Sequence, residues 1–156
     1  MKLCILVVLL AFSSLAFTSD APTDAGGDKA AILKLHAMDR DGHLKGDAEL
    51  IAAQLAPKLD EVVGGHIKTM TREEAKQQFE QYLKTVKFTQ WEDAADPIIK
   101  ISSDGQMAWM IVEIKAEVEP LDHPDEKHAF SNSSIQTFEK DAEGWHMTAI
   151  AATAGK

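Results

Sequence analysis

Cysteine is almost missing from this 156-residue sequence: the one thiol, Cys4, lies in an apolar N-terminal segment. A chain that loses this segment has no sulfur for a disulfide, a thiolate nucleophile or a zinc–thiolate site. Aromatic residues are few, with one tyrosine, three tryptophans and six phenylalanines. Basic residues are outnumbered by acidic ones, 16 to 25, and the net charge of -9 argues against nucleic acid or an anionic membrane as partner.

Long hydrophobic runs are also scarce, and the one clear example is Leu3–Phe12, which follows Lys2. This run has about half of the ~20 residues that a membrane span needs. Ser14-Leu15-Ala16 places small residues where a signal peptidase cuts. We predict a signal peptide over residues 1–16, cleavage after Ala16, and a secreted or periplasmic protein that has no membrane segment afterwards.

Residues 17–27 are rich in Thr, Asp, Pro and Gly and predict a disordered leader. Residues 28–153 suffice for one domain with a single core. Helical spacing predicts a first helix that begins at Lys29, is capped by Asp28, and ends near Gly42.

A short second helix is predicted after Asp47, which can cap it, with Pro57 as its end. Leu59–Val63 then alternates and meets Gly64-Gly65, a tight hairpin signal. Thr71 opens a third helix with a capping box, because a glutamate follows three residues later. The remaining pattern is strand only, over residues 88–92, 97–102, 106–118, 127–140 and 145–153.

The stretch 104–118, DGQMAWMIVEIKAEV, predicts the central strand. One alternate set, from Ala108 to Val118, is apolar throughout. The other set begins with Met107, Trp109 and Ile111 and turns polar afterwards. Alternate residues lie on opposite faces of a sheet, so the first half of this strand needs cover on both faces, from a helix, a ligand cavity or a partner subunit. Helices followed by such a sheet predict the α+β class.

The order of these motifs resembles a known superfamily: Gly46-Asp47 after a helix, a strand ending in Gly-Gly, a Thr-capped helix, then strands carrying DGQMAW and FEKDAEGWHM. It resembles the cone-shaped fold of nuclear transport factor 2, ketosteroid isomerase, scytalone dehydratase and the SnoaL-type polyketide cyclases, and most closely secreted or periplasmic SnoaL-like proteins of unassigned function. The resemblance covers roughly residues 30–153. It implies three N-terminal helices on a curved, mostly antiparallel sheet, an apolar pocket, and frequent homodimers through the outer face of the sheet.

The resemblance implies no single activity, because this fold carries enzymes, transport factors and scaffolds. Aligned on Gly46-Asp47, the catalytic tyrosine of ketosteroid isomerase falls at about Asp39, its general base at about Val63 and its second acid near Ser131. The essential base is therefore missing. Scytalone dehydratase needs a pair of tyrosines, whereas this chain has Tyr82 alone.

Four ionisable residues are candidates for lining the pocket. His36 and Asp39 share a helix face, Glu61 lies on the first short strand, and Glu113 shares a strand face with Trp109. A carboxylate in an apolar pocket can act as a general base. The structural alternative is that His36 and Asp39 are surface or capping groups and that Glu113 marks the point where its strand leaves the core.

The aromatic side chains Trp91, Trp109 and Tyr82 are candidates for a wall that stacks on an apolar ligand, with core packing as the alternative. No metal site is expected. The stretch Asp39–Leu44 lacks the spacing of a calcium loop, and a zinc site through His36, Asp39 and His43 has no fourth ligand. Asn132-Ser133-Ser134 is a glycosylation sequon, which matters only in a eukaryotic secretory host.

Two functional hypotheses follow. The first is a secreted SnoaL-like domain that binds a small apolar molecule without catalytic machinery or a cofactor. The alternative is a cofactor-free enzyme of lyase or isomerase type that uses Asp39, His36 or Glu61 as acid and base. In both cases we expect a homodimer through the outer face of the sheet.

Overall fold

The computed structural model describes residues 25–154, which form three helices and one seven-stranded sheet. The predicted signal peptide and residues 17–24 of the predicted leader lie outside this range. The helices are α1 (Ala25–Lys45), α2 (Ala48–Ala52) and α3 (Arg72–Leu83). The strands are β1 (Leu55–Val63), β2 (His66–Thr71), β3 (Val86–Asp93), β4 (Ile98–Ile101), β5 (Met107–Pro120), β6 (His128–Asp141) and β7 (Gly144–Ala154).

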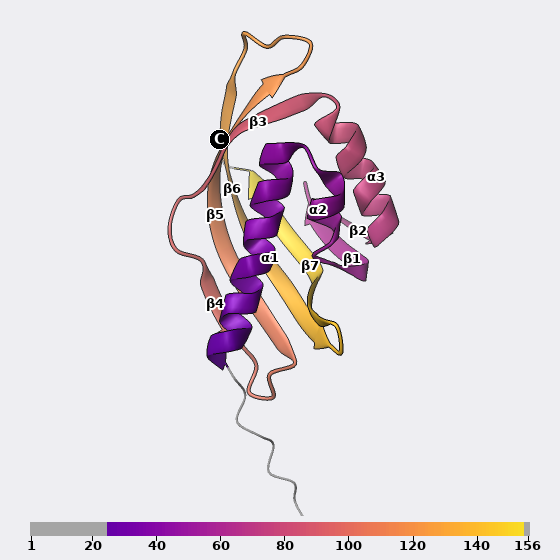
Figure 1. The fold of residues 1–156 in the computed structure, drawn as a ribbon, viewed down its shortest axis with the longest axis vertical. Coiled ribbons are helices and arrows are strands. Elements are labelled where there is room, and N and C mark those ends of the chain that lie inside the picture. The colour runs from indigo at the N-terminus through magenta and orange to yellow at the C-terminus, as the bar shows by residue number, and fades with distance from the viewer. Residues whose placement is uncertain (1–24, 155–156) are drawn as a thin grey trace, which may run out of the picture.

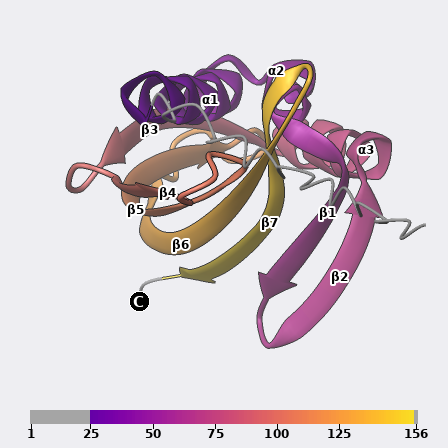
Figure 2. The same cartoon turned by 90° about the horizontal axis from the view of Figure 1, so that it is seen from below.

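The sheet is mostly antiparallel, and β1 and β7 are its parallel pair. Its order is β2-β1-β7-β6-β5-β3, and β4 pairs with the first half of β5 while β3 pairs with the second half. Helix α1 runs along one face of the sheet (Figure 1). Seen from below, the three helices lie on one side and the sheet curves away from them (Figure 2). The predicted α+β class and mostly antiparallel sheet are confirmed.

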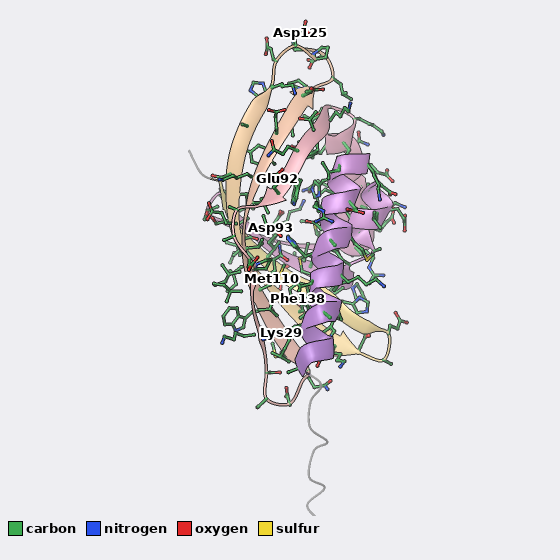
Figure 3. All side chains as sticks on the ribbon, turned by 60° about the vertical axis from the view of Figure 1, so that its left-hand side comes forward. Lys29, Glu92, Asp93, Met110, Asp125 and Phe138 are labelled. Atoms are coloured by element: carbon green, nitrogen blue, oxygen red, sulfur yellow. The ribbon has the colours of Figure 1, made fainter. Side chains whose placement is uncertain are left out.

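Strand β5 lies inside the sheet, next to its edge, where it pairs with β6 on one side and with β3 and β4 on the other. Its even-numbered residues from Ala108 to Val118 are all buried. They form the core with residues from α1 and β6, including Ile32 and Phe138, which are fully buried. Met110 and Phe138 lie in the layer between the sheet and α1 (Figure 3).

The other face of β5 is exposed, which corrects the expectation that Trp109 is buried. Met107, Trp109 and Ile111 keep 51%, 37% and 41% of their surface exposed. The described helices cover the opposite face of the sheet, and within residues 25–154 these three side chains stay exposed. We call the side of β4, β5, β6 and β7 that carries Trp109 the outer face.

Helix α1 is longer at both ends than its pattern predicted. It begins at Ala25, within the segment assigned to the leader, so Asp28 lies inside the first turn and is not the N-cap. It ends at Lys45, where Gly46 adopts a positive φ of 67°. Gly42 does not end the helix. An added Cβ there would lie 2.5 Å from Cγ1 of Ile51, so glycine is needed for the close approach of α1 to α2.

Pro57 also has a different role from the predicted one. Helix α2 ends at Ala52, and Pro57 lies inside β1, where the register with β7 shifts between Leu55 and Asp60. A proline is tolerated at such an irregularity because no ladder hydrogen bond is required of it. The predicted hairpin at Gly64-Gly65 and the capping box at Thr71 are confirmed.

Candidate ligand cavity

A cavity of about 280 Å³ lies between the helices and the inner face of the sheet. Its wall is built from the three helices and from the strands β1, β2, β3, β5, β6 and β7, so most of the fold contributes. Alternation fixes which strand residues reach it. On β5, Val112 and Ile114 line the cavity, and their register partners on β6, Ser134 and Asn132, line it beside them.

One part of the wall is aromatic and is organised around His43, in the last turn of α1. The His43 ring stacks on Trp91 with 4.2 Å between centroids and 26° between planes. Phe88 and Phe79 pack nearly perpendicular to the same ring, at centroid distances of 5.0 and 5.7 Å. Tyr82 contacts Phe88 edge-on at 6.0 Å. Such pairs hold flat rings in fixed orientations, which gives the cavity a rigid wall.

The polar part of the wall is centred on Asp39, one turn before His43 on α1. Its Oδ1 accepts a hydrogen bond of 2.8 Å from Nε2 of Gln54, a side chain that is only 1% exposed. Its backbone carbonyl accepts one of 2.9 Å from Nδ1 of His43, and its Oδ1 lies 3.5 Å from the same nitrogen. Asp39 therefore orients both Gln54 and His43, and its side chain remains on the cavity wall.

His36 is held by a partner far away in the sequence. Its Nε2 donates to Oδ1 of Asp93 at 2.7 Å, and the ring is 7% exposed. Asp93 ends β3 beside α1 (Figure 3). The other ring nitrogen, Nδ1, has neither a partner nor solvent-exposed surface. A ligand in the cavity cannot reach Nδ1 in this conformation, so His36 serves better to join α1 to β3 than to act as a base.

The sheet adds further polar groups opposite the helices. Ser134 and Gln136 are buried on β6, and Nε2 of Gln136 donates to Oγ of Ser134 at 3.3 Å. Glu61 reaches the cavity from β1, where its backbone is in register with Ile150 of β7. Tyr82 reaches it from α3, and burial raises the pKa of its hydroxyl above 10.0.

Five of the seven residues proposed from the sequence line this cavity: His36, Asp39, Glu61, Tyr82 and Trp91. Trp109 and Glu113 do not, and this corrects their assignment to the pocket. Both are odd-numbered residues of β5, and the strand's alternation places them on the outer face. Both alternate sets of β5 begin with apolar residues, so the pattern does not distinguish the face that lines the cavity from the outer face.

Among the residues that were not proposed as binding or acid–base groups are His43 and Gln54, which line the cavity, and Asp93, which holds His36. His43 was considered only as a metal ligand, although its spacing from His36 and Asp39 places all three on one side of a helix. Gln54 gave no signal, because a lone glutamine between a helix and a strand usually faces solvent. Asp93 is 57 positions from His36, and no local pattern joins the two.

In the described part of the chain, no three His, Cys, Asp or Glu side chains are grouped so that they could hold a metal ion. The histidines of α1 point to different partners, His36 to Asp93 and His43 to the Asp39 carbonyl. Among residues 25–154, no helix has both the length and the apolar character that crossing a membrane requires.

Comparison with known proteins identifies the fold of this chain. No protein-family model and no curated sequence matches the chain. Solved structures match well: a ketosteroid isomerase-like protein from Erwinia carotovora atroseptica (TM-score 0.66, 12% identity, 81% of this chain and 95% of that chain) is one. A nuclear transport factor 2-like protein from Cytophaga hutchinsonii is another (TM-score 0.65, 16% identity, 81% and 98%). The chain has the nuclear transport factor 2-like fold.

A third structure with this fold is a function-unknown protein from Mycobacterium tuberculosis (TM-score 0.70, 11% identity, 84% of this chain and 78% of that chain). Identities at this level carry the nuclear transport factor 2-like fold to this chain but no activity. The function has to be argued from the cavity itself.

Proposed function

We propose that this protein binds a small, mostly apolar molecule in the cavity, as a member of the SnoaL-like branch of the nuclear transport factor 2-like fold. The observation that carries the proposal is the unfilled space of about 280 Å³ behind an aromatic wall. Ligand sites are typically concave, mostly apolar and lined by aromatic side chains with a few polar groups, and this cavity has all of these features. The volume lies just below the ~300–1,000 Å³ of pockets for drug-sized ligands, which favours a smaller molecule.

Mass spectrometry of small molecules extracted from the protein, purified from its native host, tests this proposal. A matched pair of variants separates the cavity from the rest of the surface. Ala152 lines the cavity, whereas its neighbour Ala151 is on the outer face of β7 and in register with Ile135. We expect Ala152→Phe to remove the co-purified molecule and Ala151→Phe to retain it. Equal ligand content in the two folded variants would contradict the proposal.

The alternative, a cofactor-free lyase or isomerase, is favoured by one observation: His36, Asp39 and Glu61 all line the same cavity. Asp39 and Glu61 are its stronger members, because Nδ1 of His36 has no exposed surface. If the extracted molecule is converted by the protein, Asp39→Asn and Glu61→Gln should lower kcat more than ligand affinity. Unchanged kcat in both variants would rule out their acid–base role.

We also propose that the protein works outside the cytoplasm. The support is the apolar run Leu3–Phe12 followed by the small residues before Ala16. N-terminal sequencing of the exported protein should find Phe17 as the first residue. Recovery of a chain with an intact Met1 from the cytoplasm would contradict export.

The outer face supports a homodimer. Ile98, Ile111, Ile135 and Ala151 are successive register partners across β4, β5, β6 and β7. The three isoleucines of this row keep 54%, 41% and 43% of their surface exposed. A contiguous apolar area on a soluble protein usually marks an interface, and a two-fold axis lets one patch cover itself.

A further inference from the structure

We propose that Nε2 of His43 is the hydrogen-bond acceptor for a hydroxyl group on the ligand, so that the cavity selects a planar cyclic molecule that carries a hydroxyl. This inference rests on the proposed function and names the chemical class of its ligand. His43 entered the sequence analysis only as a candidate zinc ligand. It is carried by the tautomer of His43, its access to the cavity and the aromatic rings around it.

The tautomer follows from the partner of Nδ1. That nitrogen lies 2.9 Å from the backbone carbonyl of Asp39, and a carbonyl oxygen can only accept a hydrogen bond. Nδ1 therefore carries a proton. In the neutral imidazole the lone pair then lies on Nε2, which becomes an acceptor.

Nε2 of His43 has no hydrogen-bond partner in residues 25–154, and it is not among the buried, unpartnered atoms. It therefore keeps accessible surface, although the residue as a whole is only 7% exposed. His43 lines the cavity, and the proposal directs the accessible surface of Nε2 to a ligand there. By contrast with Nε2 of His43, neither Nδ1 of His36 nor Nε1 of Trp91 has exposed surface. His43 thus offers the cavity wall a ring nitrogen with accessible surface.

The surroundings of Nε2 specify the rest of the ligand. Trp91 lies against one side of the His43 ring, and Phe79 and Phe88 pack nearly perpendicular to it. All three line the cavity, together with Tyr82 and Phe130. Flat apolar rings pack well against such a wall. A ring that lies against these side chains and directs a hydroxyl at Nε2 satisfies both the apolar surface and the unpaired acceptor.

A planar alcohol and its methyl ether separate the two parts of the proposal. 2-Naphthol can donate to Nε2, whereas 2-methoxynaphthalene has a similar ring but no donor. Titration calorimetry on the full mature chain should show binding of both, with naphthol about tenfold tighter, because the ether leaves the acceptor Nε2 without a donor. If neither compound binds, both the proposed function and this inference fail. Equal affinity for the two compounds overturns this inference alone.

Substitution of His43 locates the acceptor. His43→Phe keeps a flat ring against Trp91 but removes Nε2, and should lower the naphthol-to-ether preference to about one while ether binding is retained. His43→Gln returns a side-chain acceptor and should restore part of the preference. His123→Phe, in the exposed β5–β6 loop, is the control and should leave the preference unchanged. A full preference in His43→Phe would overturn the assignment.

Nitrogen NMR of the unsubstituted protein gives a readout that does not depend on the variants folding. With histidine labelled at both ring nitrogens, naphthol should move the Nε2 resonance of His43 and the ether should leave it near its free position. The Nδ1 resonance should change little, because its bond to the Asp39 carbonyl is kept. No difference between the two compounds at Nε2 would overturn the inference.

Discussion

The indole nitrogen Nε1 of Trp145 donates a 2.9 Å hydrogen bond to the carboxylate of Asp28, which precedes it by 117 positions. The same Oδ1 of Asp28 accepts a 2.7 Å bond from Nζ of Lys140. Trp145 and Asp28 are both buried. The β6–β7 hairpin is thereby joined to the first turn of α1, the helix that carries His36, Asp39 and His43.

We expect Asp28→Asn to lower the free energy of unfolding by about 1.5–3 kcal/mol, the range for hydrogen bonds to a charged group. The substitution keeps the side-chain shape but removes the charge that Lys140 and Trp145 both contact. Chemical denaturation measures the loss. Asp125→Asn, in an exposed loop, is the matched control and should stay within about 0.5 kcal/mol of the parent.

The stability that Asp28 contributes should depend on pH. The Lys140 ammonium, and then the Trp145 indole, hold the pKa of the Asp28 carboxyl below its ordinary value of 3.8. A lowered pKa in the folded state gives stability that is present above 3.8 and is lost as the pH falls through the folded value. The difference between parent and Asp28→Asn should therefore be constant near neutrality and shrink in acid. A difference that widens in acid would contradict this role.

Gly42→Ala should destabilise the protein although alanine favours helices. The new Cβ would lie 2.5 Å from Cγ1 of Ile51 and 3.0 Å from the Asp47 carbonyl oxygen. Overpacking costs ~1–3 kcal/mol, which exceeds the ~1 kcal/mol that alanine gains over glycine inside a helix. Gly26→Ala, at an exposed position of the same helix, should be neutral or slightly stabilising. A higher melting temperature for Gly42→Ala would show that α2 can move away at little cost.

Local signals predicted the parts of the fold that depend on near neighbours. The Gly64-Gly65 hairpin and the Thr71 capping box are set within a few residues, and both formed as expected. The predicted roles of Asp28 and Gly42 were wrong because both residues make contacts with parts of the chain outside their own helix. Asp28 looked like a helix cap but binds Lys140 and Trp145, and Gly42 looked like a helix end but contacts α2.

The candidate site was predictable only where a helix or strand face could be identified. His36 and Asp39 were found because helical spacing puts them on one side of α1. The cavity face of β5 could not be chosen from sequence, because both alternate sets begin apolar, and so Trp109 was misplaced. The partners Gln54 and Asp93 join the site through contacts across 15 and 57 positions. Contacts between residues so far apart produce no helical or strand periodicity in the sequence.

Met110 and Trp109 are neighbours on β5 that test which face holds the core. Met110 is fully buried, whereas Trp109 is 37% exposed. At a concentration where the protein is monomeric, we expect Met110→Ala to lower the free energy of unfolding by about 2–5 kcal/mol. Trp109→Ala should cost clearly less, because its side chain leaves no enclosed cavity. Urea denaturation compares the two. A larger loss for Trp109→Ala would mean that the outer face is covered within the monomer.

The last prediction is that Ile111→Lys abolishes self-association while leaving the fold intact. Ile111 lies in the middle of the exposed apolar row, between its register partners Ile98 and Ile135. A lysine there stays solvated in a monomer but would bring two like charges into a two-fold interface, where desolvation is costly. Sedimentation equilibrium at micromolar concentration should give a dimer mass for the parent and a monomer mass for the variant, with unchanged far-ultraviolet circular dichroism. Asp125→Lys, in the exposed β5–β6 loop, adds the same side chain away from the outer face and should remain dimeric. A parent mass that stays at one chain as concentration rises would rule out the dimer, because an apolar patch that is buried by self-association must respond to mass action.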